Sequence, residues 1–144
     1  MASVIHFELV TLDGTKFSEE VYEVVLPTPQ GYIGVFPNHM PLVSIASSGV
    51  ISVRRKSSDP DSRLEYFATN GGVIEVADNT VRVLADEADH ETAINEQEAE
   101  KAFKLAQKLH AESKTQIELE QAKSLMDRHA VRLQVAKLRR RKRR

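Results

Sequence analysis

Histidine is the residue type in this chain with the widest chemical use, because it titrates near neutral pH and binds metals. It occurs five times in well-separated stretches, as His6, His39, His90, His110 and His129. A catalytic site also needs a nucleophile or a metal, and a group that orients the base. The sequence contains no G-x-S-x-G, H-E-x-x-H, G-x-x-x-x-G-K-[ST] or G-x-G-x-x-G motif. Scattered histidines rarely converge, so we predict no catalytic residues, no metal site and no cofactor.

His39 has the most unusual setting of the five. It lies between Pro37 and Pro41 in the apolar stretch YIGVFPNHMPL. Proline lacks a backbone N–H and restricts the residue before it, so Phe36 and Met40 are expected to be extended. His39 would then be held at a fixed place between two strands. The serines that follow it precede a glycine, which is typical of a strand-ending turn rather than a nucleophile.

Charge divides the sequence into two unlike parts. Residues 1–88 carry 6 Lys and Arg against 12 Asp and Glu, net −6, whereas residues 89–144 carry 14 against 9, net +5. The last six residues, RRRKRR, are all basic. A chain of 144 residues without cysteine favours one domain with a small appendage and excludes a disulfide framework. We expect a mildly acidic body with a basic segment that contacts a partner.

The RRRKRR tail is compatible with several targets. It could contact nucleic acid, anionic lipid or an acidic protein, or be a solvated helix end whose cations suit the helix dipole. No aromatic residue follows Phe103, so the basic part lacks the stacking platforms of single-stranded nucleic-acid binders. We therefore favour an acidic protein surface. The start of the chain lacks the pattern of a signal peptide, and no apolar run reaches about 18 residues, which predicts a soluble or peripheral protein.

The first 88 residues are predicted to form short β-strands. Turn formers such as Asp13-Gly14 and Asp78-Asn79 separate runs rich in Val, Ile, Phe and Tyr. In VIEVA and TVRVLA every second residue is apolar, as in a strand with one buried face. The predicted runs are VIHFELVT, VYEVVLP, MPLVSI, GVISVRR, RLEYFAT, GGVIEVA and NTVRVLA. Short strands at regular spacing predict a β-sandwich or flattened barrel as the domain of residues 1–88.

Residues 89–144 are predicted to form a second, helical domain. Apolar residues recur every three or four positions in 95–112 and again in 116–138, which indicates two helices. Two pairs resemble capping boxes at their starts: Asn95 with Glu98, and Thr115 with Glu118. The short AESKT link makes an antiparallel hairpin. Each apolar stripe is narrow, so the hairpin must lean on the sheet or on another chain and could move between them.

Two long stretches, LPTPQGYIGVFPNHMPLVSIASSGVI and YFATNGGVIEVADNTVRVLADEA, followed by the two helices, closely resemble the epsilon subunit of bacterial F-type ATP synthase, called delta in mitochondria. The resemblance covers nearly the whole chain. It implies a β-sandwich, a flattened barrel of about ten short strands, followed by a C-terminal antiparallel helical hairpin. It also implies a protein that is no enzyme by itself and is peripheral to the cytoplasmic face of the bacterial cell membrane.

The same resemblance implies partners and a role. Members of this family bind the gamma subunit and the c-subunit ring in the central stalk, rotate with both, and help couple ion flow to ATP synthesis. Their helices pack against the sandwich or extend along gamma, where basic residues face an acidic segment of the beta subunits and restrain ATP hydrolysis.

The resemblance carries contact residues onto two places in this chain. The candidates for c-ring and gamma contact are Gly31, Tyr32, Ile33, Gly34, Phe36, His39 and Met40. The candidates for beta-subunit contact are Lys123, Arg128, Arg132, Lys137, Arg139 and Arg140. In the first set we expect the glycines to permit a turn and close approach, and the histidine to hydrogen-bond within that edge or to gamma.

Two features differ from the family. Some members bind ATP through Ile/Leu-Asp-x-x-Arg-Ala, but here the matching stretch is INEQEA, with Asn95 replacing the acid and Glu98 replacing the arginine. A carboxylate would repel phosphate, so we predict no useful ATP binding. The RRRKRR end is also unusually basic, and we hypothesise that it adds to inhibition, so that deleting residues 139–144 raises ATPase activity.

One alternative function stays open at this point. The chain could be a free-standing adaptor that uses its basic hairpin on nucleic acid or anionic lipid. Stable binding to gamma would support the rotor subunit, whereas binding only to polyanions with steep salt dependence would support the adaptor.

Overall fold

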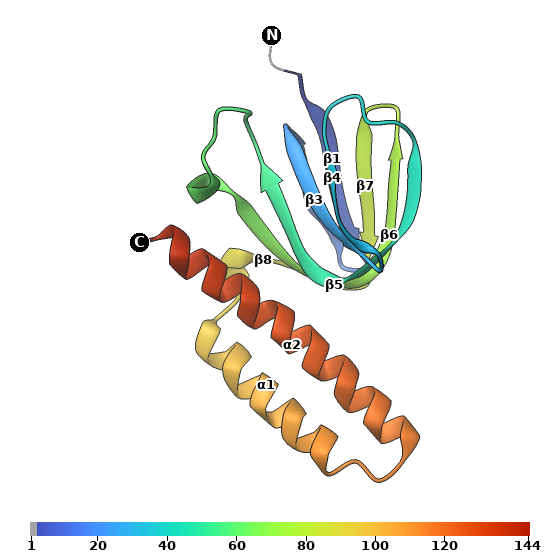
Figure 1. Ribbon diagram of the computed structural model, residues 1–144, viewed down its shortest axis with the longest axis vertical. Helices are drawn as coiled ribbons and strands as arrows, with labels where there is room; N and C mark the ends of the chain where they lie inside the picture. The colour runs from blue at the N-terminus through green and yellow to red at the C-terminus, as the bar shows by residue number, and fades with distance from the viewer. Residues whose placement is uncertain (1–2) are drawn as a thin grey trace.

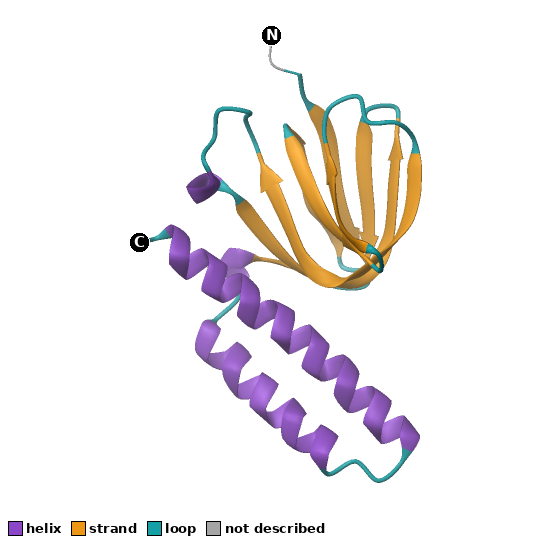
Figure 2. Ribbon diagram, viewed as in Figure 1, coloured by secondary structure: helices purple, strands orange, loops and turns teal. Residues whose placement is uncertain are grey.

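The computed structural model describes residues 3–144, which hold eight strands, two short 3-10 turns and two helices (Figures 1 and 2). The strands are β1 (Ile5–Thr11), β2 (Gly14–Val21), β3 (Glu23–Thr28), β4 (Gly31–Val35), β5 (Leu42–Arg54), β6 (Glu65–Ala77), β7 (Thr80–Ala85) and β8 (Ala88–His90). The turns are η1 (Asp61–Arg63) and η2 (Glu91–Ala93), and the helices are α1 (Glu96–Ala111) and α2 (Gln116–Lys142).

The eight strands form one sheet that folds over on itself. Their order is β2-β1-β7-β6-β5-β3-β4, with β8 paired to β6. The pairings are antiparallel except for that of β1 with β7, which is parallel. Strands β5 and β6 have 13 residues each and pair with each other along almost their whole length. Both bend near the middle and so take part in both layers of a sandwich (Figure 1).

The burial pattern shows where these two strands pass from one layer to the other. In β5, the side chain that points into the sandwich interior has an even residue number at Ala46 but an odd one at Ile51. In β6, the inward-pointing side chains change from an odd residue number at Phe67 to an even one at Ile74. Side chains alternate strictly in a regular strand, so each change requires an irregular residue at the bend.

Gly72 supplies the irregular backbone at the bend of β6. Its φ is 145°, and that of the preceding Gly71 is 95°. A Cβ added to Gly72 would lie 2.1 Å from the carbonyl oxygen of Leu84. Only glycine fits this combination of positive φ and close backbone approach.

The predicted sandwich with a helical hairpin is confirmed, but the described residues form eight strands rather than about ten. Four predicted runs merge in pairs: MPLVSI and GVISVRR lie within β5, and RLEYFAT and GGVIEVA within β6. The serines before Gly49 therefore lie inside a continuous strand instead of ending one. Strands β2, β4 and β8 are absent from the predicted runs. In β2 only Phe17 and Val21 are buried, too few to give an apolar alternation.

The interior of the sandwich is a continuous apolar core. Phe17 contacts two other rings of this core, with its ring centroid 5.4 Å from that of Phe7 and 5.6 Å from that of Phe67. These rings join β1, β2 and β6. Tilted and edge-on contacts of this kind add to the hydrophobic gain of burying the rings.

Both helices begin as the sequence predicts. Asn95 Oδ1 accepts the backbone N–H of Glu98 at 3.0 Å, and Thr115 Oγ1 accepts that of Glu118 at 3.1 Å. Glu118 Oε2 in turn accepts the N–H of Lys114 at 2.9 Å. The second helix continues through Lys142, four residues beyond the predicted end at 138.

Helix α2 packs against the outer side of β5 and β6. Val50, Tyr66 and Ala68 point away from the sandwich interior and form a second apolar core with Val131 and Val135. We call these three sheet residues the covered face. The hairpin therefore leans on the sheet, one of the two supports that the sequence predicts.

A second outer face of the sheet has no helix on it. Val43, Ile45, Val73 and Leu84 are 75%, 64%, 45% and 50% exposed. Ile45 lies opposite Val73 on the neighbouring strand, and Val73 lies opposite Leu84 on the next. They form a row across β5, β6 and β7, beside Val43, and we call these four residues the open face.

Candidate functional site

Strand β4 contains the first four candidates for partner contact and lies at one edge of the sheet. Gly31, with a φ of 121°, closes the β3–β4 turn, and its carbonyl accepts the hydroxyl of Thr28 at 2.5 Å. Tyr32 also joins β4 to β5, because its hydroxyl accepts a hydrogen bond from the backbone N–H of Val50 at 3.2 Å. At Gly34 an added Cβ would only touch the Phe36 ring at 3.4 Å. The turn therefore requires glycine at the first position and not at the second.

The loop after β4 contains the other three candidates. The Phe36 ring packs edge-on against Tyr22, with 5.6 Å between centroids. His39 Nδ1 donates to the carbonyl of Met40 at 2.7 Å, which fixes the ring in the loop. A hydrogen bond within this edge is one of the two roles that the sequence predicts for His39. Met40 is 74% exposed and leads directly into β5.

Asn79 holds this loop in place and is not among the sequence-predicted site residues. Its Oδ1 accepts the N–H of Asn38 at 2.8 Å, and its Nδ2 donates to the carbonyl of Val4 at 2.8 Å. One side chain in the β6–β7 turn thus joins the loop to the start of β1. The sequence signal was the Asp78-Asn79 turn, but nothing in it shows that the amide bridges residues 41 and 75 positions away.

The seven candidates of the first set do not form one patch. Tyr32 contacts the middle of β5, whereas Asn38, beside His39, contacts the β6–β7 turn. The length of β4 separates the two places, about 16 Å for five residues at roughly 3.3 Å each. The turn at Gly31 and the loop at His39 are therefore two separate regions of the surface.

A row of charges borders the open face. Val43 lies opposite Glu75, which lies opposite Arg82. Arg82 Nε donates to Glu8 Oε2 at 2.9 Å, and this hydrogen bond holds the pKa of Glu8 below its usual range. An apolar row bordered by charged side chains is typical of a protein-binding surface.

The open face was missed by sequence reasoning, although the sequence carries a signal for it. Strict alternation predicts one apolar face per strand, and the buried face of β6 and β7 is indeed formed by Ile74, Val76, Val81 and Val83. Val73 and Leu84, however, stand next to Ile74 and Val83 in the chain. Adjacent apolar residues in a strand mean that both faces are apolar, as in sheets covered on both sides.

Helix α2 contains the second candidate set, and the structure pairs part of it with acids of the same chain. Arg128 Nε lies 2.8 Å from Glu87 Oε2, and Arg132 forms a hydrogen-bonded ion pair with Asp89. The positions 128 and 132 are one helical turn apart, so the two pairs stack along the helix. Glu87 lies between β7 and β8, and Asp89 lies within β8.

The end of α2 continues this pattern. Arg139 donates to the carbonyl of Glu91, and Arg140 Nη1 lies 2.9 Å from Glu96 Oε1. Lys123 and Lys137 are exposed and form no ion pair among residues 3–144. Four of the six candidates for beta-subunit contact are therefore engaged within the chain when the hairpin is docked.

His129 lies between Arg128 and Arg132 on this helix. Its Nδ1 atom is buried and finds no hydrogen-bond partner within the described part of the chain. Burial, together with the charges of Arg128 and Arg132, lowers the pKa of His129, while Glu87 opposes the shift. The other four histidines lie on β1, the His39 loop, β8 and α1, so the five occupy separate elements.

The start of α1 borders an open, mostly polar hollow of about 800 Å³. Asn95 lies there, and its side-chain oxygen already accepts the hydrogen bond that caps the helix. Glu96 and Glu100 line the hollow opposite Arg139 and Arg140. Arg140 pairs with Glu96, so the hollow is lined by charges of both signs, and the lack of useful ATP binding stays a prediction.

Comparison with known proteins places this architecture in a family. Residues 4–91 match the model of the ATP synthase delta/epsilon chain beta-sandwich domain. The ATP synthase epsilon chain of Herpetosiphon aurantiacus is 36% identical over 137 residues, covering 94% of this chain and 96% of that protein.

Solved structures show the same fold. A chain of the Euglena gracilis mitochondrial ATP synthase has a TM-score of 0.75 at 20% identity, covering 90% of this chain and 79% of its own. A chain of the Tetrahymena thermophila mitochondrial ATP synthase central stalk and c-ring has a TM-score of 0.57 at 13% identity, covering 90% and 93%. By its matched sandwich and its full-length relative, this chain belongs to the delta/epsilon chain family of ATP synthase and is an epsilon subunit of the F type.

Proposed function

We propose that this chain is a non-catalytic rotor subunit of the central stalk, which binds gamma through its open face. The observation that carries the proposal is the exposed apolar row of Ile45, Val73 and Leu84. Burying about 100 Å² of such surface contributes roughly 2.5 kcal/mol, so an uncovered row favours a permanent partner. The loop at His39 runs directly into Val43, which makes Phe36, His39 and Met40 part of the same contact.

The β3–β4 turn is the proposed contact with the c-subunit ring. Gly31, Tyr32 and Ile33 lie there, one length of β4 away from the His39 loop. Two separate regions on one rigid sandwich would let the subunit touch gamma and the ring together. Such a bridge helps couple ion flow to ATP synthesis.

The helical hairpin is the proposed brake on ATP hydrolysis. In the docked form Arg128, Arg132 and Arg140 are paired with acids of this chain. Release of the hairpin would free these cations for an acidic segment of the beta subunits, to which Lys123, Lys137 and Arg139 would add. A charged helix that changes partners keeps its ion pairs in both positions, which reduces the free-energy difference between them.

The proposed location is the cytoplasmic face of the bacterial cell membrane, where the chain is held by its complex. In residues 3–144 no helix is both long and apolar enough to cross a bilayer. Attachment would therefore come from gamma and the ring. The division of the chain after residue 88 stays a prediction; β8 carries the sheet on to His90.

Co-purification with gamma tests the rotor function. We expect the full chain to bind isolated gamma stably, with little loss of affinity between 50 and 300 mM salt, because the contact is mainly apolar. An adaptor for nucleic acid or anionic lipid would instead bind only polyanions and weaken steeply with salt.

The brake is tested by fixing the hairpin. Because the chain has no cysteine, Asp89→Cys with Arg132→Cys creates a unique pair that a short bismaleimide can link across the docking interface. We expect the linked subunit to support faster ATP hydrolysis in a reconstituted complex than the same variant left unlinked. Equal rates would contradict the brake.

Calorimetry with ATP and the isolated chain should show no binding at micromolar concentrations.

A further inference from the structure

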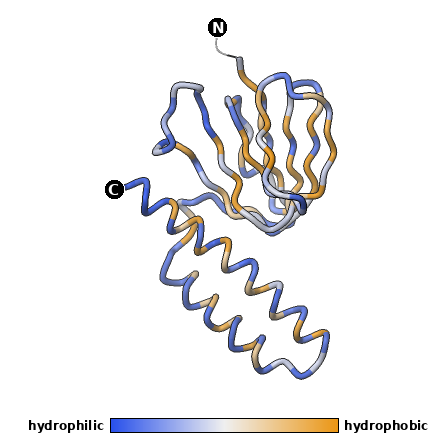
Figure 3. Tube along the Cα trace, in the orientation of Figure 1, coloured by the Kyte–Doolittle hydropathy of each residue, from blue (hydrophilic) through white to orange (hydrophobic). Residues whose placement is uncertain are grey.

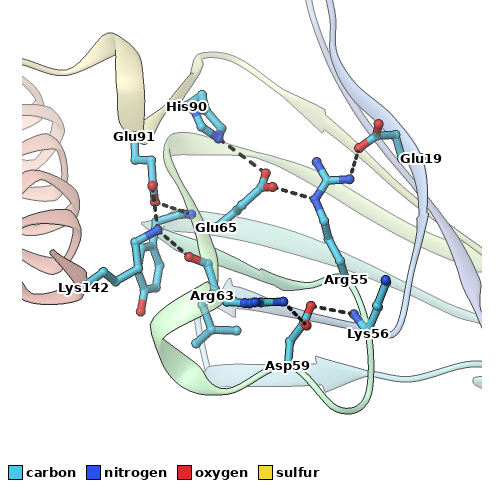
Figure 4. A network of polar contacts seen from close by, with 11 residues as sticks. Glu19, Arg55, Lys56, Asp59, Arg63, Glu65, His90, Glu91 and Lys142 are labelled. Atoms are coloured by element: carbon cyan, nitrogen blue, oxygen red, sulfur yellow. Dashed lines mark hydrogen bonds and ion pairs between the residues drawn. The ribbon is translucent and has the colours of Figure 1, made fainter.

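The last turn of α2 contains a lysine that is far less exposed than a solvated basic tail would allow. The Lys142 side chain is 16% exposed, and its Nζ lies 2.6 Å from Glu91 Oε1 and 2.6 Å from the carbonyl of Leu64 (Figure 4). It also lies 5.1 Å from the centroid of the Tyr66 ring. A carboxylate, a carbonyl and a ring face match the three donors of an ammonium group.

Glu91 is the partner that makes this contact specific. Its side chain is 10% exposed, and its second oxygen accepts the N–H of Tyr66 at 3.0 Å. Its backbone carbonyl accepts a hydrogen bond from Arg139. A buried carboxylate is costly unless it is paired, so Glu91 depends on Lys142 remaining in place.

The pairs along α2 differ in how strongly they can hold the helix. The side chains of Arg128 and Arg140 are 39% and 55% exposed, and ion pairs of this kind contribute little in water. The Lys142 pair is the least exposed of those between α2 and the rest of the chain. Among the ion pairs of this helix, it is the one whose loss would leave a charge buried without a partner.

We propose that Lys142 and Glu91 form a latch that holds the helical hairpin on the covered face. The latch closes the far end of α2 onto η2 and the start of β6, while Val131 and Val135 pack further along the same helix (Figure 1). Figure 3 shows this end of α2 as hydrophilic. Few apolar side chains can pack there, so the ion pair is what holds this part of the helix.

The latch reverses the effect expected of the basic tail. The sequence suggested that RRRKRR adds to inhibition and that its loss raises ATPase activity. If Lys142 holds the hairpin down, its loss frees the helices and lowers ATPase activity in the complex. This consequence rests on the proposed brake, whereas the latch itself does not.

Thiol labelling of the isolated full chain tests the latch alone. Ala68 is 6% exposed beneath α2, so Ala68→Cys gives a single thiol that a reagent reaches only when the hairpin lifts. Adding Lys142→Gln should speed labelling at least about tenfold, because it leaves Glu91 buried and unpaired. The matched control is Arg144→Gln, which removes one charge from the exposed end of the same tail and should change the rate less than about twofold.

Two further variants keep the result interpretable. A thiol at Ala85→Cys, inside the sandwich, reports opening of the whole domain and should label at the same slow rate with or without Lys142→Gln. Glu91→Gln should also speed labelling at Ala68→Cys, and combining it with Lys142→Gln should add little. Equal labelling of the Lys142→Gln and Arg144→Gln chains would overturn the latch.

ATPase assays of the reconstituted complex separate the latch from the brake. Lys142→Gln should lower the hydrolysis rate relative to Arg144→Gln. Faster labelling with an unchanged hydrolysis rate would retain the latch and contradict the proposed function of the hairpin. Slow labelling would reject the latch whatever the hydrolysis rate.

Discussion

The covered face and three of the four residues of the open face belong to the same two long strands but meet different surroundings. On one side of the bend, Val50, Tyr66 and Ala68 are buried beneath α2. On the other side, Val43, Ile45 and Val73 are between 45% and 75% exposed. Both faces are apolar, so composition does not distinguish them. The chain supplies a cover for one face only, and the other is left for a partner.

The way each face can be uncovered also differs. The covered face is sealed by apolar packing near Val135 and by charges at both ends of the docked helix segment, so its cover can be lifted without opening the sandwich. The open face is part of rigid strands whose inner sides form the main core. A movable regulator and a permanent attachment can thus share one small domain.

The largest effect should come from a charge placed under the cover. Val135 is fully buried between α2 and the sheet. Val135→Asp should weaken docking by about 3 kcal/mol or more, because an unpaired carboxylate cannot be solvated there. Hydrogen exchange should then show lost protection in α2 but not in β1 or β7.

The matched variant is Val43→Asp on the open face, where Val43 is 75% exposed. Its effect on the free energy of unfolding should stay below about 1.5 kcal/mol in urea titrations, because the carboxylate remains in solvent and only the low strand propensity of Asp and the opposite Glu75 act against it. Similar losses for the two substitutions would mean that the faces do not differ as described.

The bend between the faces should be the next most sensitive place. Gly72→Ala forces a Cβ toward the carbonyl of Leu84 and a strained φ, and should cost about 2 to 3 kcal/mol in urea unfolding. Gly34→Ala is the control, since its Cβ would only touch the Phe36 ring, and should change stability by less than about 1 kcal/mol. If both variants were equally stable, the bend would not depend on glycine.

The smallest effect is a pH dependence of the cover. Burial and the neighbouring arginines lower the pKa of His129 in the docked form, so the undocked form binds more protons in acid. The contribution of neutral His129 to the stability of the docked form is therefore complete above its ordinary pKa of about 6.5. It is lost as the pH falls below that value. Thiol labelling at Ala68→Cys, divided at each pH by the rate of the same thiol in the urea-unfolded chain to remove the pH dependence of the thiolate, should be faster at pH 5.5 than at 7.5. The difference should shrink in His129→Gln; an equal difference would assign it to other groups.

Local patterns in the sequence predicted much of this architecture. The helix starts follow from Asn95 and Thr115, whose side chains act on backbone only three residues away. Strands β5 and β6 were each predicted as two separate runs because their bends carry Ser, Asn and Gly, which resemble turns. Whether such residues end a strand or bend it depends on pairing with a distant strand, and local sequence does not contain that information.

The contacts at the candidate sites depended on long-range geometry to a greater degree. The sequence showed a basic tail but not that Lys142 meets Glu91, 51 residues earlier. The resemblance grouped Tyr32 with His39, which are close in the chain but lie at opposite ends of β4. Their separation follows from the extended backbone between them, and the need for the Asn79 bridge follows from the fold of the whole sheet.

The most direct test of the central claim is the affinity of this chain for gamma when the open face is charged. Ile45→Asp with Leu84→Asp, two positions separated by the strand that carries Val73, should weaken binding to isolated gamma at least about a hundredfold when compared by calorimetry with the unchanged chain. Thermal unfolding should show a melting temperature within a few degrees of the original, since both side chains are exposed. Undiminished affinity in a correctly folded double variant would contradict the account, because gamma would then bind elsewhere.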